Sequence, residues 1–268
     1  MIVWIQYLEA ALATVRRDAS IYLSYRLRFA SQILAMVFTL TIFFYVSKLV
    51  RPDAVGHHGQ YYQFVVVGIV TLAILEAALT ISQLVRLELV AGNFERLVIS
   101  PFGPVAGAMS MAAFPIGFAM LFAVIMLAVA AGVFGLPVHV GGIPLALVVA
   151  GLGGVTFAAI GLLFVSALIA YKSAMGATWV MAALGLIGGI YFPISLFPGW
   201  IRWAADVQPL TPAVDLLRHA LVGTPSMQAK WVELLKLGGF AAVLMPVAGM
   251  TLWQAVKISR RRGTLMEY

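Results

Sequence analysis

Residues 61–85 read YYQFVVVGIVTLAILEAALTISQLV, and Glu76 is the only charged side chain in this stretch. An α-helix rises about 1.5 Å per residue, so about 20 apolar residues cross the roughly 30 Å hydrocarbon layer of a bilayer. Backbone polar groups inside that layer must bond to one another, which a helix achieves within a single segment. The stretch therefore predicts a membrane-spanning helix.

Five other stretches have the same character: residues 29–50, 105–134, 144–170, 174–191 and 237–258. Across the whole chain of 268 residues, 63% are hydrophobic and 10% are charged, and the mean hydropathy is +1.02. Soluble domains carry about 25% charged residues, so this composition excludes that class. We predict an all-α integral membrane protein with six transmembrane helices. It forms one domain over residues 1–268, with a six-span bundle at 29–258 and a tail at 259–268.

Lysine and arginine are distributed unevenly between the two predicted faces of the bundle. Six spans place both termini on the same side, and positively charged residues concentrate on the cytoplasmic side of membrane proteins. Eleven Lys and Arg residues flank the side that carries the termini, and six flank the other side. Both termini are therefore expected in the cytoplasm. The net charge of +7 does not indicate nucleic-acid binding, because no basic stripe with interleaved aromatic residues is present.

Residues 1–28 combine apolar positions with the charges of Arg16, Arg17 and Asp18. A helix of this kind lies along the headgroups with its arginines near anionic lipid, so we predict an interfacial helix. A cytoplasmic tail with no special task is the alternative.

Residues 92–101, between the second and third predicted spans, form a candidate short helix. Gly92 breaks the preceding element, Asn93 is a suitable N-cap, and Glu95 lies in the first turn, where the helix dipole favours a carboxylate. Pro101 ends the element. Its apolar side chains need a partner surface, which lipid or a second protein could provide: Phe94, Leu97, Val98 and Ile99.

Residues 191–223 contain features that interrupt a regular helix on the outer side. Pro193 and Pro198 cannot continue one, and Trp200 is typical of the membrane–water interface. After Pro209, the sequence indicates a second short helix, so we predict two short re-entrant or interfacial helices here. Irregular backbone at membrane depth is tolerated only when it is buried in protein or lines water.

The second of these helices has recognisable ends. Thr211 is expected to be its N-cap, with Pro212 in the first position, and Gly223 is expected to end it. Within it, Asp215 and Arg218 are three residues apart and share one face.

Glu76 is the only carboxylate within a predicted span, and Thr80 and Gln83 continue a polar stripe along the same helix face. This stripe could line a pore, bind a cationic group or seal a dimer by hydrogen bonds. A hydrated position near the inner leaflet is the alternative. Glycines at 151, 153, 154, 161, 185 and 189 permit close helix–helix approach, either within one subunit or at a moving interface.

These segments together resemble the type-2 family of ABC transporter permeases, which are membrane subunits of bacterial exporters. The resemblance rests on residues 16–29, on residues 91–101, and most specifically on residues 192–218. One departure is Val67, where many relatives have proline before Gly68; it is expected to change local helix geometry only.

The resemblance implies two permease copies, identical or paralogous, with two ATP-binding-cassette ATPase subunits in the bacterial inner membrane. Residues 92–101 would be the coupling helix that docks in a cleft of the ATPase. ATP and Mg would bind to that partner and not to this chain, which lacks the glycine-rich loop that cradles phosphates.

Two other functions have less support in the sequence. A secondary transporter often shows internal repeats and several buried charges, and this sequence offers only Glu76. An intramembrane enzyme needs a nucleophile–base pair or a metal-ligand set. The only candidate pair is Asp215 with His219, and no carboxylate cluster joins His57 and His58 to indicate a metal site.

Overall fold

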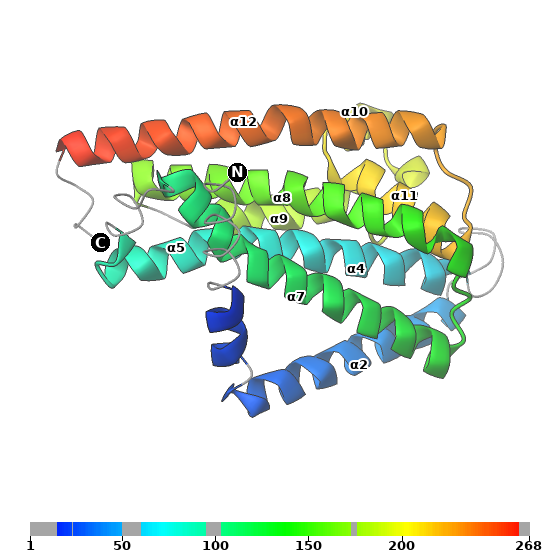
Figure 1. Cartoon of the computed structure of the whole chain (residues 1–268). Helices are drawn as coiled ribbons and strands as arrows, with labels where there is room; N and C mark the ends of the chain where they lie inside the picture. The colour runs from blue at the N-terminus through cyan, green and yellow to red at the C-terminus, as the bar shows by residue number, and fades with distance from the viewer. Residues whose placement is uncertain (1–14, 23, 50–59, 95–102, 173–175, 263–268) are drawn as a thin grey trace.

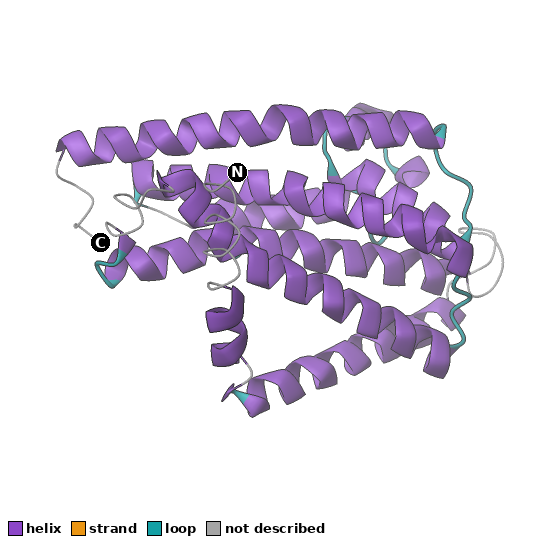
Figure 2. Ribbon diagram, in the orientation of Figure 1, coloured by secondary structure: helices purple, strands orange, loops and turns teal. Residues whose placement is uncertain are grey.

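The computed structural model describes residues 15–22, 24–49, 60–94, 103–172 and 176–262. Every regular element among these residues is helical (Figure 2). The predicted all-α class is therefore confirmed for the described part of the chain.

Five helical segments are long and apolar enough to cross a membrane. They are α2 (Arg26–Leu49), α4 (Gln60–Leu79) continued by α5 (Ile81–Val90), α7 (Gly103–Phe134), α8 (Ile143–Tyr171) and α12 (Lys230–Arg262). Only Thr80 separates α4 from α5, so the pair forms one segment of 31 residues. The last predicted span, residues 237–258, lies wholly inside α12, which is longer at both ends.

The predicted span at residues 174–191 corresponds to a shorter helix. Helix α9 (Gly176–Ile187) has 12 residues, fewer than the roughly 20 that a bilayer requires. The chain turns at Gly188 and Gly189, and Gly189 has a φ of +72° that L side chains rarely adopt. The predicted end at residue 191 was therefore too late. Helix α9 packs against α4 and leads back toward the end of the bundle that holds α10 and α11 (Figure 1).

Short helices gather at that end of the bundle. They are η1 (Val140–Gly142), η2 (Ile194–Leu196), α10 (Gly199–Asp206) and α11 (Leu210–Val222). Helix α11 ends at Gly223, whose φ of +71° is left-handed, as the sequence predicted.

The expected N-cap of α11 was wrong. Pro209, with a φ of −77° and a ψ of −15°, precedes the first helical residue, and Pro212 is the third residue of the helix. Proline's fixed φ already suits a helix start, so the helix begins before Thr211. The Thr211 hydroxyl instead accepts a hydrogen bond of 3.2 Å from Gln208 Nε2.

Two helical segments form the centre of the bundle. Within the most apolar stretch of each segment, 61% of the residues of α4–α5 and 56% of those of α8 are buried. The corresponding share is 11% in α2 and in α12. Helices α12 and α2 accordingly lie at opposite sides of the molecule in Figure 1. Both peripheral helices turn large apolar side chains outward, as a lipid-facing surface requires: Leu34, Phe38, Val243 and Met250 are examples.

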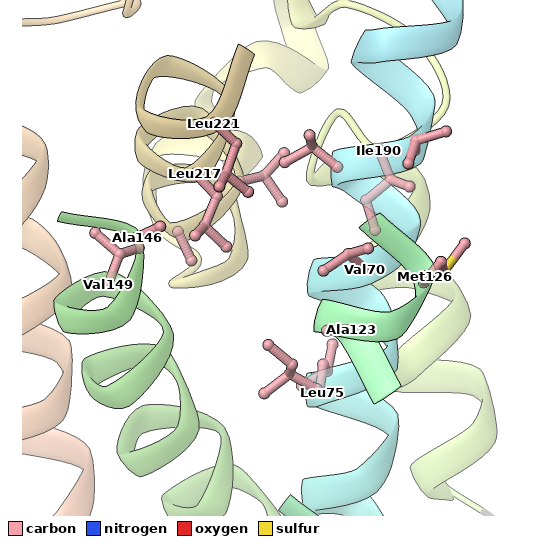
Figure 3. Packing of buried hydrophobic residues seen from close by; sticks show 14 of the residues in the cluster. Val70, Leu75, Ala123, Met126, Ala146, Val149, Ile190, Leu217 and Leu221 are labelled. Atoms are coloured by element: carbon pink, nitrogen blue, oxygen red, sulfur yellow. The ribbon is translucent and has the colours of Figure 1, made fainter. Parts of the chain in front are cut away.

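The buried side chains form two clusters along the bundle. The first lies near η1 and α11 and joins α4, α7, α8 and α11, where Val70, Val149 and Leu217 contribute to a single core (Figure 3). The second cluster lies further along α8, and joins α5, α7, α8 and α12.

The N-terminal segment breaks earlier than expected. Residues 15–22 are helical, the helix is interrupted near Tyr25, and α2 begins at Arg26. The short helix lies at a steep angle to the long helices (Figure 1). The Tyr22 ring packs on α7, 4.5 Å from the ring centre of Phe118 and 5.9 Å from that of Phe114. The predicted residues 1–14 of the interfacial helix lie outside the described part of the chain.

Glycines in α8 let neighbouring helices approach closely within this one chain. A Cβ at Gly161 would lie 2.4 Å from the carbonyl oxygen of Ala78 in α4, and one at Gly154 would lie 2.8 Å from Met120 in α7. Intrasubunit packing is thus confirmed for these two glycines. Gly151 in the same helix faces open space in the structure.

We expect Gly161→Ala to destabilise the protein and Gly151→Ala to leave it unchanged or slightly more stable. Overpacking costs about 1–3 kcal/mol, whereas an unobstructed Gly→Ala change in a helix gains up to about 1 kcal/mol. Thermal unfolding of both variants in the same detergent measures the difference. Equal midpoints would contradict the close packing of α8 on α4.

Candidate functional site

Helix α11 carries a pair of charged residues into the protein interior. Arg218 is 6% exposed and Asp215 is 8% exposed, although the helix has only 13 residues. Charged side chains are rarely buried to this extent without polar partners. The partners of these two residues therefore identify the segments that α11 holds together.

The Arg218 guanidinium binds two segments that are distant in sequence. Its Nε donates to the carbonyl oxygen of Phe64 in α4 at 2.9 Å. Its Nη2 donates to the carbonyl oxygens of Gly189 and Ile190, just after α9, at 2.9 and 3.0 Å. The guanidinium carbon also lies 3.3 Å from the centre of the Phe64 ring, in a cation–π contact.

Two of these bonds satisfy backbone carbonyls that lie outside any helix. Helix α9 ends at Ile187, so Gly189 and Ile190 belong to the turn that follows it. Because the region is buried, water does not readily replace a protein donor. Arginine suits the position since its five N–H donors are fixed in a planar fork. Burial lowers the pKa of Arg218, and the charge of Asp215 partly offsets that change.

Gly68 provides the space for this arrangement. A Cβ at Gly68 would lie 2.8 Å from the Ile190 carbonyl oxygen and 3.0 Å from Arg218 Nη2. A larger side chain would displace the guanidinium from α4. The neighbouring Val67 is fully buried and α4 continues through it without interruption, so the sequence difference from many relatives leaves the helix intact.

Asp215 and His219 hold the connection from α11 to α12. The Asp215 carboxylate accepts a hydrogen bond of 2.8 Å from the backbone N–H of Met227. His219 Nδ1 donates to the carbonyl oxygen of Thr224 at 2.9 Å. Burial raises the pKa of Asp215, while the bond from Met227 and the charge of Arg218 lower it. Both side chains thus bond to backbone, so the pair has a structural explanation.

The other residues predicted for the outer segment border its short helices. Pro193 precedes η2 and Pro198 precedes α10. Trp200 is exposed on α10, in keeping with an interfacial position. On the same helix, Arg202 donates from Nε to the Phe197 carbonyl oxygen and from Nη2 to that of Ser195, both at 2.7 Å. Lys236 of α12 lies 3.7 Å from a carboxylate oxygen of Asp206 at the end of α10.

At the opposite end of the bundle, the structure describes the start of the predicted coupling helix. Gly92 has a φ of +70°, and the Asn93 N–H donates to the Glu88 carbonyl oxygen at 2.9 Å. Phe94 is 2% exposed and belongs to the second buried cluster, so its partner surface lies within its own chain. The remaining predicted residues lie outside the described part of the chain: Glu95, Leu97, Val98 and Pro101.

Glu76 and Gln83 are exposed on a segment whose other faces are mostly buried, and Thr80 between them is partly exposed. The Thr80 hydroxyl donates to the Ala77 carbonyl oxygen at 2.6 Å. The three residues therefore share a face of α4–α5 that the described residues leave uncovered. Helix α9 borders this face, because a Cβ at Gly185 would lie 3.3 Å from Leu72.

Two features of these sites were missed from the sequence. The sequence does not indicate which carbonyl groups bind Arg218, because every residue has a backbone carbonyl. Glu233, in the first turn of α12, is 3% exposed. No local signal marks this burial, because the apolar residues two positions away on either side, Trp231 and Leu235, are exposed.

We expect Arg218→Lys to lower the unfolding midpoint clearly and Arg202→Lys to change it little. Lysine loses the planar fork and leaves at least one buried carbonyl unpaired, at a cost of about 1–3 kcal/mol. Arg202 is a matched control because it binds two backbone carbonyls, against three for Arg218, but is exposed, where substitutions usually stay within about 0.5 kcal/mol. Thermal unfolding measures both variants, and similar shifts would rule out the special role of Arg218.

Comparison with known proteins places the chain in a family. The family model described as ABC-2 type transporter matches residues 8–222, which is more than half of the chain. The matched region includes both the Gly92–Phe94 turn and α11 with Arg218, and its last residue is the last residue of α11. A search of curated proteins finds no match. The chain belongs to the ABC-2 type transporter family.

Proposed function

We propose that the chain is the permease subunit of an ATP-driven exporter, forming the translocation path and coupling to a separate ATP-binding-cassette subunit. The observation that carries this proposal is the family match over residues 8–222. ATP is bound together with Mg on the partner chain, and it is hydrolysed there. The arrangement of the outer helices and the coupling turn supports a mechanism for transmitting that energy.

The proposed topology has six crossings, with α9 and the residues around it as the fifth. Helices α8 and α12 both run toward the end of the bundle where α5 ends, and α10 and α11 lie at the other end (Figure 1). The chain between α8 and α10 must therefore return across the bundle, and α9 lies on that path. In this topology α10 and α11 are the two re-entrant or interfacial helices of the outer side.

Charge at the two ends of the bundle supports an orientation with both termini in the cytoplasm of a bacterium. Near the ends of α5, α8 and α12 lie Arg86, Lys172, Lys257, Arg260 and Arg261, and the described part of the chain ends on this side, at the last residue of α12. Positively charged residues concentrate on the cytoplasmic side, so this end faces the ATPase in the inner membrane.

Movement would pass between the two ends of the subunit through the α4–α5 segment. Arg218 binds the Phe64 carbonyl near one end of this segment, and the Gly92–Phe94 turn follows directly from the other end. Phe94 anchors the coupling helix to the second cluster, so a displacement of that helix would also displace α5. Closure of the ATPase would in this way shift the outer helices.

A second permease copy, identical or paralogous, would complete the translocation path. The Glu76 face of α4–α5 supports this proposal, because the described residues of the chain leave it uncovered. A carboxylate that faced hydrocarbon at mid-bilayer would cost about 2.5–3.5 kcal/mol. The face therefore borders either a water-filled pore or the seam with the second copy.

Co-expression with the ATP-binding subunit and reconstitution into proteoliposomes test the proposed function. We expect Glu95→Arg to abolish ATP-driven export and substrate-stimulated ATPase activity at an unchanged unfolding midpoint, because charge reversal disrupts the docking helix. Phe94→Ala should instead destabilise the permease by about 3–5 kcal/mol, because it empties a buried site. Glu88→Arg, on α5 before the turn, is the charge-matched control. Failure to bind an ATP-binding subunit, or transport without ATP, would overturn the function.

Two exposed valines test the orientation, because the chain contains no cysteine. Val90 at the end of α5 and Val207 after α10 are each 62% exposed. With a membrane-impermeant maleimide on intact cells, we expect Val207→Cys to react and Val90→Cys to react only after permeabilisation. The reverse pattern would invert the topology, and equal labelling of both would exclude opposite faces.

A further inference from the structure

A pocket of about 520 Å³ lies between the C-terminal end of α12 and the start of α7. Its volume falls within the range of about 300–1,000 Å³ that is usual for small-molecule sites. The two helices pack together nearby, since a Cβ at Gly249 in α12 would lie 3.8 Å from Val105 in α7. Six side chains line the pocket: Pro104, Trp253, Val256, Lys257, Arg260 and Arg261.

Three of the six lining residues are cationic and none is acidic. Lys257, Arg260 and Arg261 stand at i, i+3 and i+4, so they share one face of α12 and repel one another. The ion pairs among the described residues join Arg17 with Asp18 and Lys236 with Asp206, and include none of the three. An anion in the pocket would relieve this repulsion.

The residues around the pocket are of the kinds found at the depth where phospholipid headgroups lie. Trp253 is half exposed, as is usual for tryptophan at the membrane–water interface, and Lys257 Nζ lies 4.6 Å from its ring centre. Arg260 and Arg261 lie about one helical turn after Lys257, at the end of the membrane-spanning helix. Val256 and Pro104 give the pocket an apolar part beside its cationic rim.

We propose that this pocket binds the phosphate group of an anionic phospholipid. Basic pockets between membrane helices bind such headgroups, with each Lys or Arg contributing about fivefold in affinity. Lys257, Arg260 and Arg261 would contact the phosphate, while Trp253 and Val256 contact the glycerol and upper acyl chain. The bound lipid would join α12 to the start of α7. The proposal requires only that α12 crosses the bilayer, so it is independent of the transport direction and of the ATPase.

Native mass spectrometry of the full chain tests the proposal, after exchange into mixed micelles of phosphatidylglycerol and phosphatidylcholine. We expect retained phosphatidylglycerol to exceed retained phosphatidylcholine. The triple variant Lys257→Gln, Arg260→Gln and Arg261→Gln should weaken this retention by about a hundredfold. The matched control Lys48→Gln, Arg202→Gln and Lys230→Gln removes the same charge from the opposite end and should change it less than twofold. The double variant Arg260→Lys and Arg261→Lys should retain the lipid.

Four results would overturn the proposal. Equal retention of the two lipids by the unaltered chain would exclude selection of an anionic headgroup, and equal losses in both triple variants would exclude this pocket. Millimolar inorganic phosphate that displaces phosphatidylglycerol completely would identify a site for the free anion. If the pocket variant keeps its lipid but no longer co-purifies with the ATP-binding subunit, the surface serves that protein partner.

Discussion

The hydrogen bonds from Arg218 to three backbone carbonyls are the constraint on which the end of the bundle that holds α10 and α11 depends. They join α11 to α4 and to the chain just after α9, which are far apart in sequence. A buried guanidinium is stable here because its N–H groups bond to carbonyl oxygens in a region that water cannot readily reach. Gly68 makes the contact possible by leaving space beside α4. The same bonds pair the carbonyls of Gly189 and Ile190 in the turn after α9.

The α4–α5 segment connects this constraint to the opposite end of the bundle. It is the most buried of the long segments, packed against α7 and α8, and its close contact with α8 at Gly161 leaves little freedom for sliding. At its far end, Phe94 is held in the second cluster. A packed interior resists gradual deformation, so displacements at one end of such a segment are carried along it. This is the physical basis of the proposed coupling to a separate ATP-binding subunit.

The exposed surfaces of the subunit fall into distinct chemical classes. The outer faces of α2 and α12 are apolar and suit lipid. The Glu76 face of α4–α5 is polar and suits water or a second copy. The end of α12 carries a cationic pocket with a tryptophan at its edge, which suits a headgroup. Each class follows from the solvent that the surface meets: hydrocarbon, water or the phosphate layer between them.

The sequence by itself determined the fold class, most helix boundaries and the short helices within residues 191–223, because apolar run length and turn residues are local properties. Gly223 ended α11 as predicted, since the left-handed conformation depends on that residue alone. Only the tertiary structure decided which residues Arg218 binds, that Phe94 faces its own core, and that Glu233 is buried. The start of α11 also depended on its surroundings, because Pro209 and Thr211 both suit a helix start. Contacts between distant segments depend on how helices pack in three dimensions, and a periodic sequence does not state which neighbour each face will meet.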